Sequence, residues 1–503
     1  MLRTVALLIV FSGFLAAQTN PAASAARRWR QDHERAILGE FTELLAIPNI
    51  ASDRPGIRRN AEFIRMLLEK RGVVARLVDY PDANPVVFGE IRTPGAARTI
   101  VLYAHYDGQP LDPKEWVTPP FEPVLRDRSL EKDGRAIPLA DAHFPLDPES
   151  RIYARSASDD KAPIVAMVTA LDAIHAAGLK LHSNIRFVFE GEEEAGSVNL
   201  EKILAAHKDL FAADVWLICD GPVAQNRQQL IAFGARGITE VDITVYGPRH
   251  ELHSGHYGNW APNPALMLAR LLTSMKDDSG RVLVDRFYDG IEPLSDTEKR
   301  AIADAPDIDA ELKQELWLGS TESAPKKLIE LLQLPSLNIR GMASSRTGAQ
   351  ASNVIPSTAT ASIDMRLVKG MDHRETEARL IGHIRKQGYF VVDSEPSAET
   401  RRAHEKVARV TVHEGGYNAV RTSMDLPVSR EVIRVVESAR GPAVKVPTMG
   451  GSVPLESIER ALGTRTITIP IANHDNNQHS FNENIRVQNL WDGIELMAAL
   501  IAM

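Results

Sequence analysis

Short apolar runs alternate with stretches of helical periodicity over the first 220 residues of the chain. The apolar runs are rich in β-branched and aromatic residues, which is typical of strands, whereas the longer stretches repeat apolar positions every three or four residues. Strands are predicted at 74–80, 85–91, 99–104, 184–189 and 214–220, and helices at 27–46, 57–72, 162–178 and 195–207. Strands alternating with helices of this size indicate an α/β fold, a mostly parallel sheet with helices on both faces.

A different pattern begins after residue 237. Residues 238–247 and 359–368 alternate apolar with polar positions, which indicates half-exposed strands of an antiparallel sheet with one covered face. The earlier pattern returns after residue 424, and a chain of 503 residues is long enough for two domains. We therefore predict a catalytic domain in two parts, 26–237 and 425–503, interrupted by an inserted α+β domain at 238–424.

The first residues have the pattern of an export signal. Arg3 precedes an apolar segment at 5–17, and small residues follow it. The segment is too short to span a bilayer comfortably. We predict a signal peptide at 1–25, cleaved after Ala17 or within 22–25, and hence a periplasmic or secreted protein; an uncleaved membrane anchor is the alternative. No second long apolar run follows, so no stable membrane span is predicted.

Composition narrows the classes of function. The content of 44% hydrophobic and 25% charged residues is that of an ordinary soluble globular protein. Acids and bases are interspersed at a net charge of -8, which argues against a nucleic-acid binder, whose footprint is basic and clustered. Cys219 is the single cysteine, so any metal site must depend on histidines and carboxylates rather than on thiolates.

Acidic and histidine side chains stand at four consecutive junctions between the predicted strands and helices. Each group alone has a plain structural explanation, such as a solvated acidic patch, a helix cap or a turn. Four such junctions in succession are poorly explained by four independent coincidences. The groups are His105 and Asp107 after 99–104, Asp159 and Asp160 before the helix at 162–178, Glu192, Glu193 and Glu194 after 184–189, and Asp220 at the end of 214–220.

The carboxyl ends of parallel strands meet at one edge of a sheet, so these groups are expected to lie together. Carboxylates packed there repel one another unless a cation or a shared proton offsets the repulsion. A polar loop near the end of the chain adds His474 and His479, either of which could complete a site. Two histidines with three or four carboxylates suit a pair of divalent ions with a bridging carboxylate. One glutamate of the run would bind metal while its neighbour acts as a general base.

Nine segments with these positions resemble the M20 family of co-catalytic metallopeptidases, close to its carnosinase-like dipeptidase and glutamate carboxypeptidase branch. They occur in the family's order over nearly the whole chain and form a highly specific set. The segments are VLYAHYDGQP, EWVTPPFEP, RSASDDKAP, EGEEEAGS, ICDGP, LHSGHYG, SNVIPSTATASIDMR, GGSVP and QHSFNEN.

The resemblance implies a role for each candidate residue. Glu193 would be the general base that activates water, and Asp107 would orient His105. The inserted domain would be a lid and dimerisation module of a homodimer. The implied metal ligands are Asp159 between two ions, His105 and Asp220 at one ion, and Glu194 and His479 at the other.

Four further residues would contact the substrate or the reacting carbonyl. By the resemblance, His253 would reach a neighbouring subunit's active site and stabilise the oxyanion, and Arg366 would bind a substrate carboxylate. Asn263 and Ser452 are further candidates for substrate contact. A loop histidine, an ion pair on a strand face and a helix N-cap are the alternatives for His253, Arg366 and Asn263 respectively.

The chain departs from the family pattern at two places. Ala154, Ser156 and Ala162 stand where family members usually carry glycine, which concerns loop conformation rather than metal binding. The segment 126–150 is longer than the family needs, and we expect it to reshape the pocket mouth.

These inferences define a leading hypothesis and two alternatives. The leading one is an exported dinuclear peptidase that cleaves dipeptides or removes a C-terminal amino acid, with zinc as the expected metal and manganese or cobalt as alternatives. An N-acyl amino-acid amidohydrolase on the same fold is the second hypothesis, and an inactive binding protein is the third.

Overall fold

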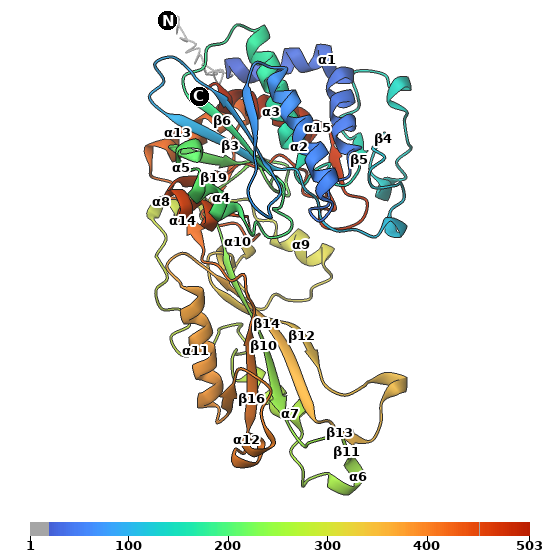
Figure 1. Ribbon diagram of the computed structural model, residues 1–503, viewed down its shortest axis with the longest axis vertical. Helices are drawn as coiled ribbons and strands as arrows, with labels where there is room; N and C mark the ends of the chain where they lie inside the picture. Colours follow the sequence, from blue (N-terminus) through green and yellow to red (C-terminus); the bar gives the residue numbers. More distant parts are fainter. Residues whose placement is uncertain (1–19, 452) are drawn as a thin grey trace, which may run out of the picture.

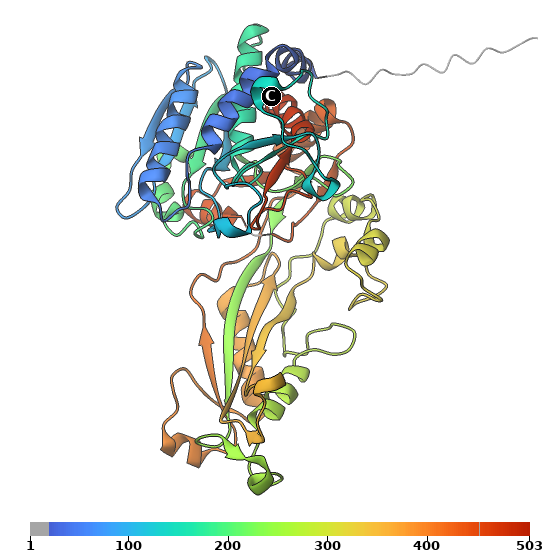
Figure 2. The ribbon, with the colours of Figure 1, turned by 90° about the vertical axis from the view of Figure 1, so that its right-hand side faces the viewer.

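The computed structural model describes residues 20–451 and 453–503. Most of the predicted signal peptide and Ser452 therefore lie outside the described residues. The described chain forms a rounded domain that contains both the first and the last helix, and a narrower domain that extends away from it (Figures 1 and 2). No helix in these two ranges is long and apolar enough to cross a membrane.

Helix α1 (Pro21–Leu45) packs within the rounded domain. The side-chain oxygen of Asn20 accepts the N–H of Ala22 at 3.0 Å and so caps the helix. Ala22 and Ala26 are buried in the main hydrophobic core. The predicted end of the signal peptide at residue 25 therefore falls inside α1, whereas the alternative cleavage point after Ala17 precedes it.

An eight-stranded sheet in the order β1-β2-β6-β3-β7-β19-β8-β18 forms the middle of the rounded domain. Its central strands β6, β3, β7 and β19 run parallel to one another, which confirms the predicted mostly parallel sheet. The strands are β1 (Val74–Val78), β2 (Val86–Ile91), β3 (Thr99–His105), β6 (Asn184–Glu190), β7 (Val215–Ile218), β8 (Leu230–Ala232), β18 (Val444–Val446) and β19 (Arg465–Thr468).

Strands β1 and β2 depart from the parallel arrangement. They pair antiparallel with each other, and β2 pairs antiparallel with β6. A parallel connection needs a crossover of a dozen or more residues, usually a helix, and the chain has only a short loop between β1 and β2. The two strands therefore form a hairpin at the sheet edge.

Helices cover both faces of this sheet (Figure 1). Successive side chains of β3 point to opposite faces, so Leu102 joins the core under α1 and Tyr103 joins the core under α14. The first face carries α1, α2 (Arg54–Glu69), α3 (Lys161–Ala176), α13 (Pro427–Arg440) and α15 (Val487–Ile501), and the second α4 (Leu200–Ala206), α5 (Lys208–Phe211) and α14 (Leu455–Leu462).

The long segment 126–150 lies against α1 rather than at the pocket mouth. Its flanking strands β4 (Val124–Arg126) and β5 (Arg151–Tyr153) form a small sheet with β20 (Asn484–Arg486). Arg35 of α1 donates to the carbonyl oxygens of Leu139 at 2.6 Å and Ala142 at 2.8 Å. These backbone contacts hold the segment against α1, where Ala142 and Leu146 join the main core. No described residue of 126–150 lines the cavity beside the candidate site, contrary to the expectation that the segment reshapes the pocket mouth.

The narrow domain is built on a five-stranded sheet in the order β12-β14-β10-β16-β15. Its strands pair antiparallel, as the alternating pattern predicts, except that β15 runs parallel to β16. Helices α7 (Pro264–Thr273) and α11 (His373–Lys386) bury apolar side chains against one face. The strands are β10 (Gly237–Tyr246), β12 (Ser336–Ala343), β14 (Thr358–Leu367), β15 (Phe390–Val392) and β16 (Val407–Val412).

Part of the inserted stretch returns to the rounded domain. Helices α8 (Asp296–Ala303), α9 (Asp309–Glu315) and α10 (Leu328–Leu331) lie beside that domain (Figure 2). Ala301 packs in the main core, and Ile329 packs against Val444 and Val446. The five-stranded sheet is therefore only one part of residues 238–424. The remaining short elements are β9 (Gly234–Ala235), β11 (Leu252–His253), β13 (Val354–Ile355), β17 (Val420–Arg421), α6 (Ser254–Tyr257) and α12 (Ala398–Ala403).

Candidate active site

The five predicted metal ligands and Glu193 lie together at the carboxyl edge of the parallel strands. They come from five separate segments, as expected for loops that follow neighbouring parallel strands. The residues are His105 at the end of β3, Asp159 before α3, Glu193 and Glu194 after β6, Asp220 after β7 and His479 in the loop after β19.

Asp159 is at the centre of this cluster. Its Oδ1 lies 2.9 Å from His105 Nε2, and its Oδ2 lies 3.2 Å from His479 Nε2. On one side, His105 Nε2 is 3.9 Å from Asp220 Oδ2. On the other, His479 Nε2 is 3.4 Å from Glu194 Oε2. One carboxylate thus joins two half-sites, each with one histidine and one further acid.

Asp107 holds both the histidine and the glutamates of the cluster. Its Oδ1 lies 3.4 Å from His105 Nδ1, a contact that can orient the imidazole ring. The same carboxylate accepts the backbone N–H of Glu193 at 3.1 Å and of Glu194 at 3.0 Å. Gln109, which the sequence argument missed, donates to Glu194 Oε2 at 2.6 Å. Gln109 follows Asp107 by two residues, which places both side chains on the same face of an extended segment. This spacing could have identified Gln109 from the sequence.

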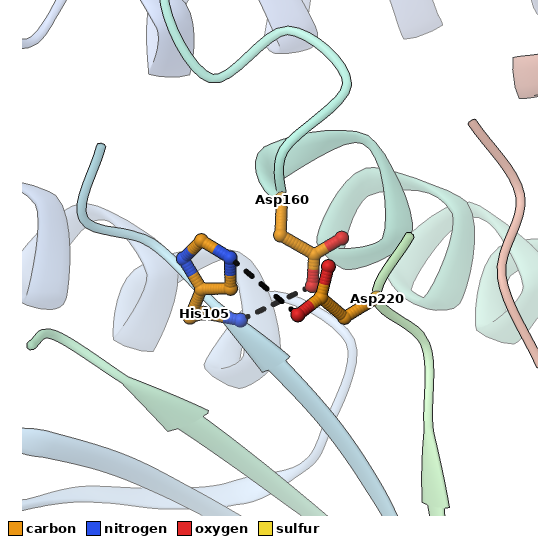
Figure 3. A group of neighbouring side chains, drawn as sticks. All are labelled: His105, Asp160 and Asp220. Atoms are coloured by element: carbon orange, nitrogen blue, oxygen red, sulfur yellow. Dashed lines mark hydrogen bonds and ion pairs between the residues drawn. The ribbon is translucent and has the colours of Figure 1, made fainter. Parts of the chain in front are cut away.

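Asp160 lies beside His105 and Asp220, and its carboxylate is next to that of Asp220 (Figure 3). Its Oδ2 accepts the backbone N–H of His105 at 3.2 Å. It stands at the N-cap of α3, but its side chain makes no capping hydrogen bond. The helix-cap explanation for this acid is therefore wrong, and Asp160 instead supports the strand end that carries His105.

Burial and like charge raise the pKa of most acids in the cluster. Burial first, and then the nearby Asp159, raise the pKa of Glu194 to about 8 and that of Asp220 to about 6. Burial also raises the pKa of Glu193 well above its usual value. Burial alone would have raised the pKa of Asp159, but hydrogen bonds to His105 and His479 outweigh it and lower the pKa.

This donor set fits two divalent ions. Without ions, the cluster balances its charge by keeping protons on carboxyl groups that would ionise readily in water. Imidazole and carboxylate groups suit zinc and related divalent metals, and two groups of these donors lie close enough to surround an ion. The two groups share His105, one with Asp159 and Glu194 and the other with Asp160 and Asp220. Ion binding would therefore displace protons from the cluster.

The raised pKa values predict that the metal-free protein loses stability as the pH rises from 5 to 6.5. In the fold Glu194 ionises only near pH 8 and Asp220 near pH 6, whereas both ionise near pH 4 when the chain is unfolded, so the folded state binds more protons in this window. Lys161, whose pKa burial lowers to about 7, remains mostly charged there and adds little. We expect chelator-treated protein to melt several degrees lower at pH 6.5 than at pH 5.

Thermal unfolding at both pH values, with and without zinc, checks this expectation. Added zinc should stabilise the protein more at pH 6.5, because fewer protons then compete for the carboxylates. A melting temperature of the metal-free protein that rises between pH 5 and pH 6.5 would contradict the assignment.

A cavity of about 830 Å³ opens beside the cluster. Asp159, Glu193, Asp220 and His479 form part of its lining, so the predicted general base faces the space that a substrate would fill. The other walls include Leu332 after α10, Glu315 of α9, and Thr448 to Gly451 of the glycine turn. Glu315 and Leu332 were not singled out in the sequence, because no local pattern indicates that the inserted stretch returns to the catalytic domain.

Three further candidates lie outside the cluster, in the narrow domain. Asn263 caps α7, and its Oδ1 accepts the N–H of Ala265 at 2.9 Å, so the N-cap alternative explains this residue. Arg366 lies on β14 opposite Ile238, at the end of the five-stranded sheet nearest the rounded domain, with its Nε 3.6 Å from Asp364. His253 is exposed where β11 meets α6, at the far tip of the narrow domain (Figure 1). The structure does not bring His253 to the cluster of its own chain.

Comparison with known proteins gives consistent matches over the chain. The model of peptidase family M20/M25/M40 matches residues 101–503. The chain is 26% identical to the Cys-Gly metallodipeptidase DUG1 of Candida albicans, over 92% of this chain and 94% of that protein. It is 26% identical to human Beta-Ala-His dipeptidase, over 99% of this chain and 96% of that protein.

A solved structure has the same architecture. The M20 family metallo-carboxypeptidase Sso-CP2 from Sulfolobus solfataricus superposes with a TM-score of 0.73 at 27% sequence identity. The match covers 93% of this chain and 98% of that one. It therefore includes both the rounded and the narrow domain.

Proposed function

Because this chain belongs to peptidase family M20/M25/M40, we propose that it hydrolyses the amide bond of a dipeptide or releases a C-terminal amino acid. The observation that carries the proposal is that Asp159 reaches His105 with one carboxylate oxygen and His479 with the other. A carboxylate shared in this way suits a pair of divalent ions. Similarity to the Cys-Gly and Beta-Ala-His dipeptidases supports a short peptide as the substrate.

Two ions, most simply zinc, fit the donors of the cluster, and manganese or cobalt suit the same groups. When bound, such ions lower the pKa of water and polarise the scissile carbonyl group. The residues proposed to hold them are His105 and Asp220 for one ion, Glu194 and His479 for the other, and Asp159 for both.

Glu193 is the proposed general base. Its carboxylate lines the cavity beside Asp159 and Asp220, where it can take a proton from water and pass it to the leaving amine. Asp107 accepts the N–H groups of Glu193 and Glu194 and so holds the two acids in different positions. Of these two neighbouring glutamates, Glu194 can therefore bind a metal ion while Glu193 transfers the proton.

Arg366 is the proposed anchor for the free carboxylate of the substrate. We expect Arg366→Ala to raise KM for dipeptides by about ten- to hundredfold with a smaller effect on kcat, because a charge-assisted hydrogen bond contributes about 1.5–3 kcal/mol. Arg340→Ala is a matched control. Arg340 lies on the neighbouring strand β12, and its guanidinium group pairs with Glu240 at 2.6 Å.

The substrate panel for this test contains dipeptides and N-acyl amino acids, assayed with and without a chelator. Faster turnover of the dipeptides supports the proposal, whereas faster turnover of the N-acyl amino acids identifies an amidohydrolase. An unchanged KM in Arg366→Ala for substrates of both kinds would remove Arg366 from the site.

We further propose a homodimer in which His253 of one copy completes the site of the other. His253 lies at the tip of the narrow domain, away from its own cluster. The same domain exposes several large apolar side chains. These are Trp260 at 78%, Met342 at 53%, Leu266 at 52% and Ile339 at 44% exposure. Burying such side chains between two copies would stabilise a dimer.

Mixing two inactive variants tests this arrangement. Glu193→Ala and His253→Ala should each have little activity alone. A mixed dimer has one site with an intact Glu193 that receives His253 from the other copy, so activity should reappear after subunit exchange. A monomer by light scattering, or no recovery in a mixture shown to contain mixed dimers, would refute the proposal.

Export to the periplasm or the outside of the cell is proposed on the sequence pattern of residues 1–17. Cleavage after Ala17 would leave α1 whole, whereas cleavage within 22–25 would remove its first turn. N-terminal sequencing of the protein recovered from each cell fraction tests both points, and an intact N-terminus in the cytoplasm would contradict export.

A further inference from the structure

Glu483 lies completely buried behind the metal cluster, four residues after His479 in the loop that leads to β20. We propose that Glu483 is a positioning residue that holds Asp159 in place and so sets the affinity of the site for its ions. The inference rests on the proposed function, because it assumes that Asp159 binds metal.

The carboxylate of Glu483 accepts hydrogen bonds from the loop that precedes α3. Its Oε1 accepts the backbone N–H groups of Ser158 and Asp159, both at 2.9 Å, and the Ser158 hydroxyl at 2.9 Å. Its Oε2 accepts the N–H of Ser156 at 2.8 Å and a guanidinium N–H of Arg155 at 2.9 Å. Five donors surround one buried carboxylate, and the guanidinium group compensates its charge.

The loop that Glu483 holds has a conformation that its sequence alone does not favour. Ser156 has φ of 62°, in the left-handed region that glycine adopts easily and that costs other residues about 1–2 kcal/mol. Its N–H donates to Glu483, and its hydroxyl accepts from Asn49 Nδ2 at 2.8 Å. These bonds explain how serine can stand where the family usually has glycine.

The same loop packs directly on the segment that carries His105 and Asp107. A Cβ added to Gly108 would lie 2.4 Å from the Ser156 hydroxyl oxygen, so the two segments are as close as they can be. Asn49 links them as well, since its Nδ2 also donates to the carbonyl oxygen of Tyr106 at 2.7 Å. A shift of the 155–159 loop would therefore change the distance between Asp159 and His105.

Glu483 thus links the two half-sites through its hydrogen bonds and through the chain that it shares with His479. It bonds to the backbone of Asp159, whose carboxylate reaches both histidines, and it belongs to the same loop as His479. Groups that orient metal ligands in this way change metal affinity or activity by about ten- to hundredfold when they are removed. The contacts of Glu483 are all to the loop and none is to the cavity in the described chain, so its effect is exerted through Asp159.

Glu483→Gln is the most informative substitution. Glutamine keeps the size and shape of the side chain. In either orientation, however, its amide points an NH₂ group at N–H donors that bond to a carboxylate oxygen in the wild type. We expect the metal-free variant to bind zinc about ten- to hundredfold more weakly than the wild type in a chelator competition. Activity should recover at high zinc concentration, because Glu193 is intact, whereas Glu193→Ala should keep its lowered kcat at every zinc concentration.

Glu495→Gln is the matched control. Glu495 is also a buried glutamate paired with an arginine, Arg27, at 2.7 Å, but it lies on α15 away from the cluster. Its loss should lower the melting temperature and leave zinc affinity unchanged. If Glu483→Gln is insoluble, Ser158→Ala removes one of the five donors and should weaken zinc binding to a smaller but measurable extent.

The outcomes separate this inference from the function on which it rests. A folded Glu483→Gln variant that binds zinc as tightly as the wild type would overturn the positioning role, and so would equal weakening in Glu495→Gln. If Glu483→Gln is insoluble, unchanged zinc affinity in Ser158→Ala would also overturn it. A wild-type protein that binds no zinc would instead overturn the proposed function, and the positioning role with it.

Discussion

Replacing Glu193 with alanine is expected to lower kcat by about 10²–10⁴-fold, the usual contribution of a general base, while two ions remain bound. The reason is that Glu193 lines the cavity, whereas the contacts that join the two half-sites are made by Asp159 with His105 and His479. Steady-state kinetics and metal analysis of the same preparation measure the two quantities together.

Glu192→Gln is the control for this prediction. Glu192 precedes Glu193 in the same run, but its two oxygens accept the N–H groups of Asn84 at 3.1 Å and Asn199 at 3.0 Å. Glutamine can still accept one of these bonds, so kcat should change little. Substantial activity in Glu193→Ala, or an equal loss in Glu192→Gln, would remove Glu193 from the role of base.

Replacing Asp159 with alanine is expected to abolish activity and to weaken both ions. A single carboxylate contacts His105 and His479, so its removal affects both half-sites, while loss of a ligand specific to one half affects one ion first. Metal content after dialysis and the rate of dipeptide hydrolysis measure this effect.

Asp160→Asn separates the two adjacent acids. Asp160 accepts the backbone N–H of His105, and asparagine can accept the same bond, so this variant should retain two ions. If Asp160→Asn loses metal and Asp159→Ala retains it, the shared carboxylate is Asp160 and the assignment is reversed.

The position of the site was readable from the sequence because parallel strands end at a common edge. His105, Asp159, Glu194 and Asp220 each follow or face the end of an apolar run, and the structure brings them together. His479 follows from the same rule, since β19 is parallel to β7. The choice between His474 and His479 could not be made from spacing, and it depended on the family resemblance.

Features that depend on long-range packing were less predictable. The antiparallel hairpin of β1 and β2 departs from the mostly parallel sheet, although residues 81–84 between the two predicted strands already form a connection too short for a parallel crossover. The return of α8 to α10 to the rounded domain depends on contacts such as that of Ile329 with the cluster of Ala232, Val444 and Val446, which leave no local periodicity. The surroundings of Glu483 are likewise invisible in sequence, because its partners lie more than 300 residues away.

The central claim is that one carboxylate serves two ions, and the number of ions per chain tests it most directly. Metal analysis of the purified protein should find two divalent ions per chain, and a chelator should remove them together with dipeptide hydrolysis, which returns when zinc is restored. A protein that hydrolyses dipeptides fully with one ion or none would contradict the account.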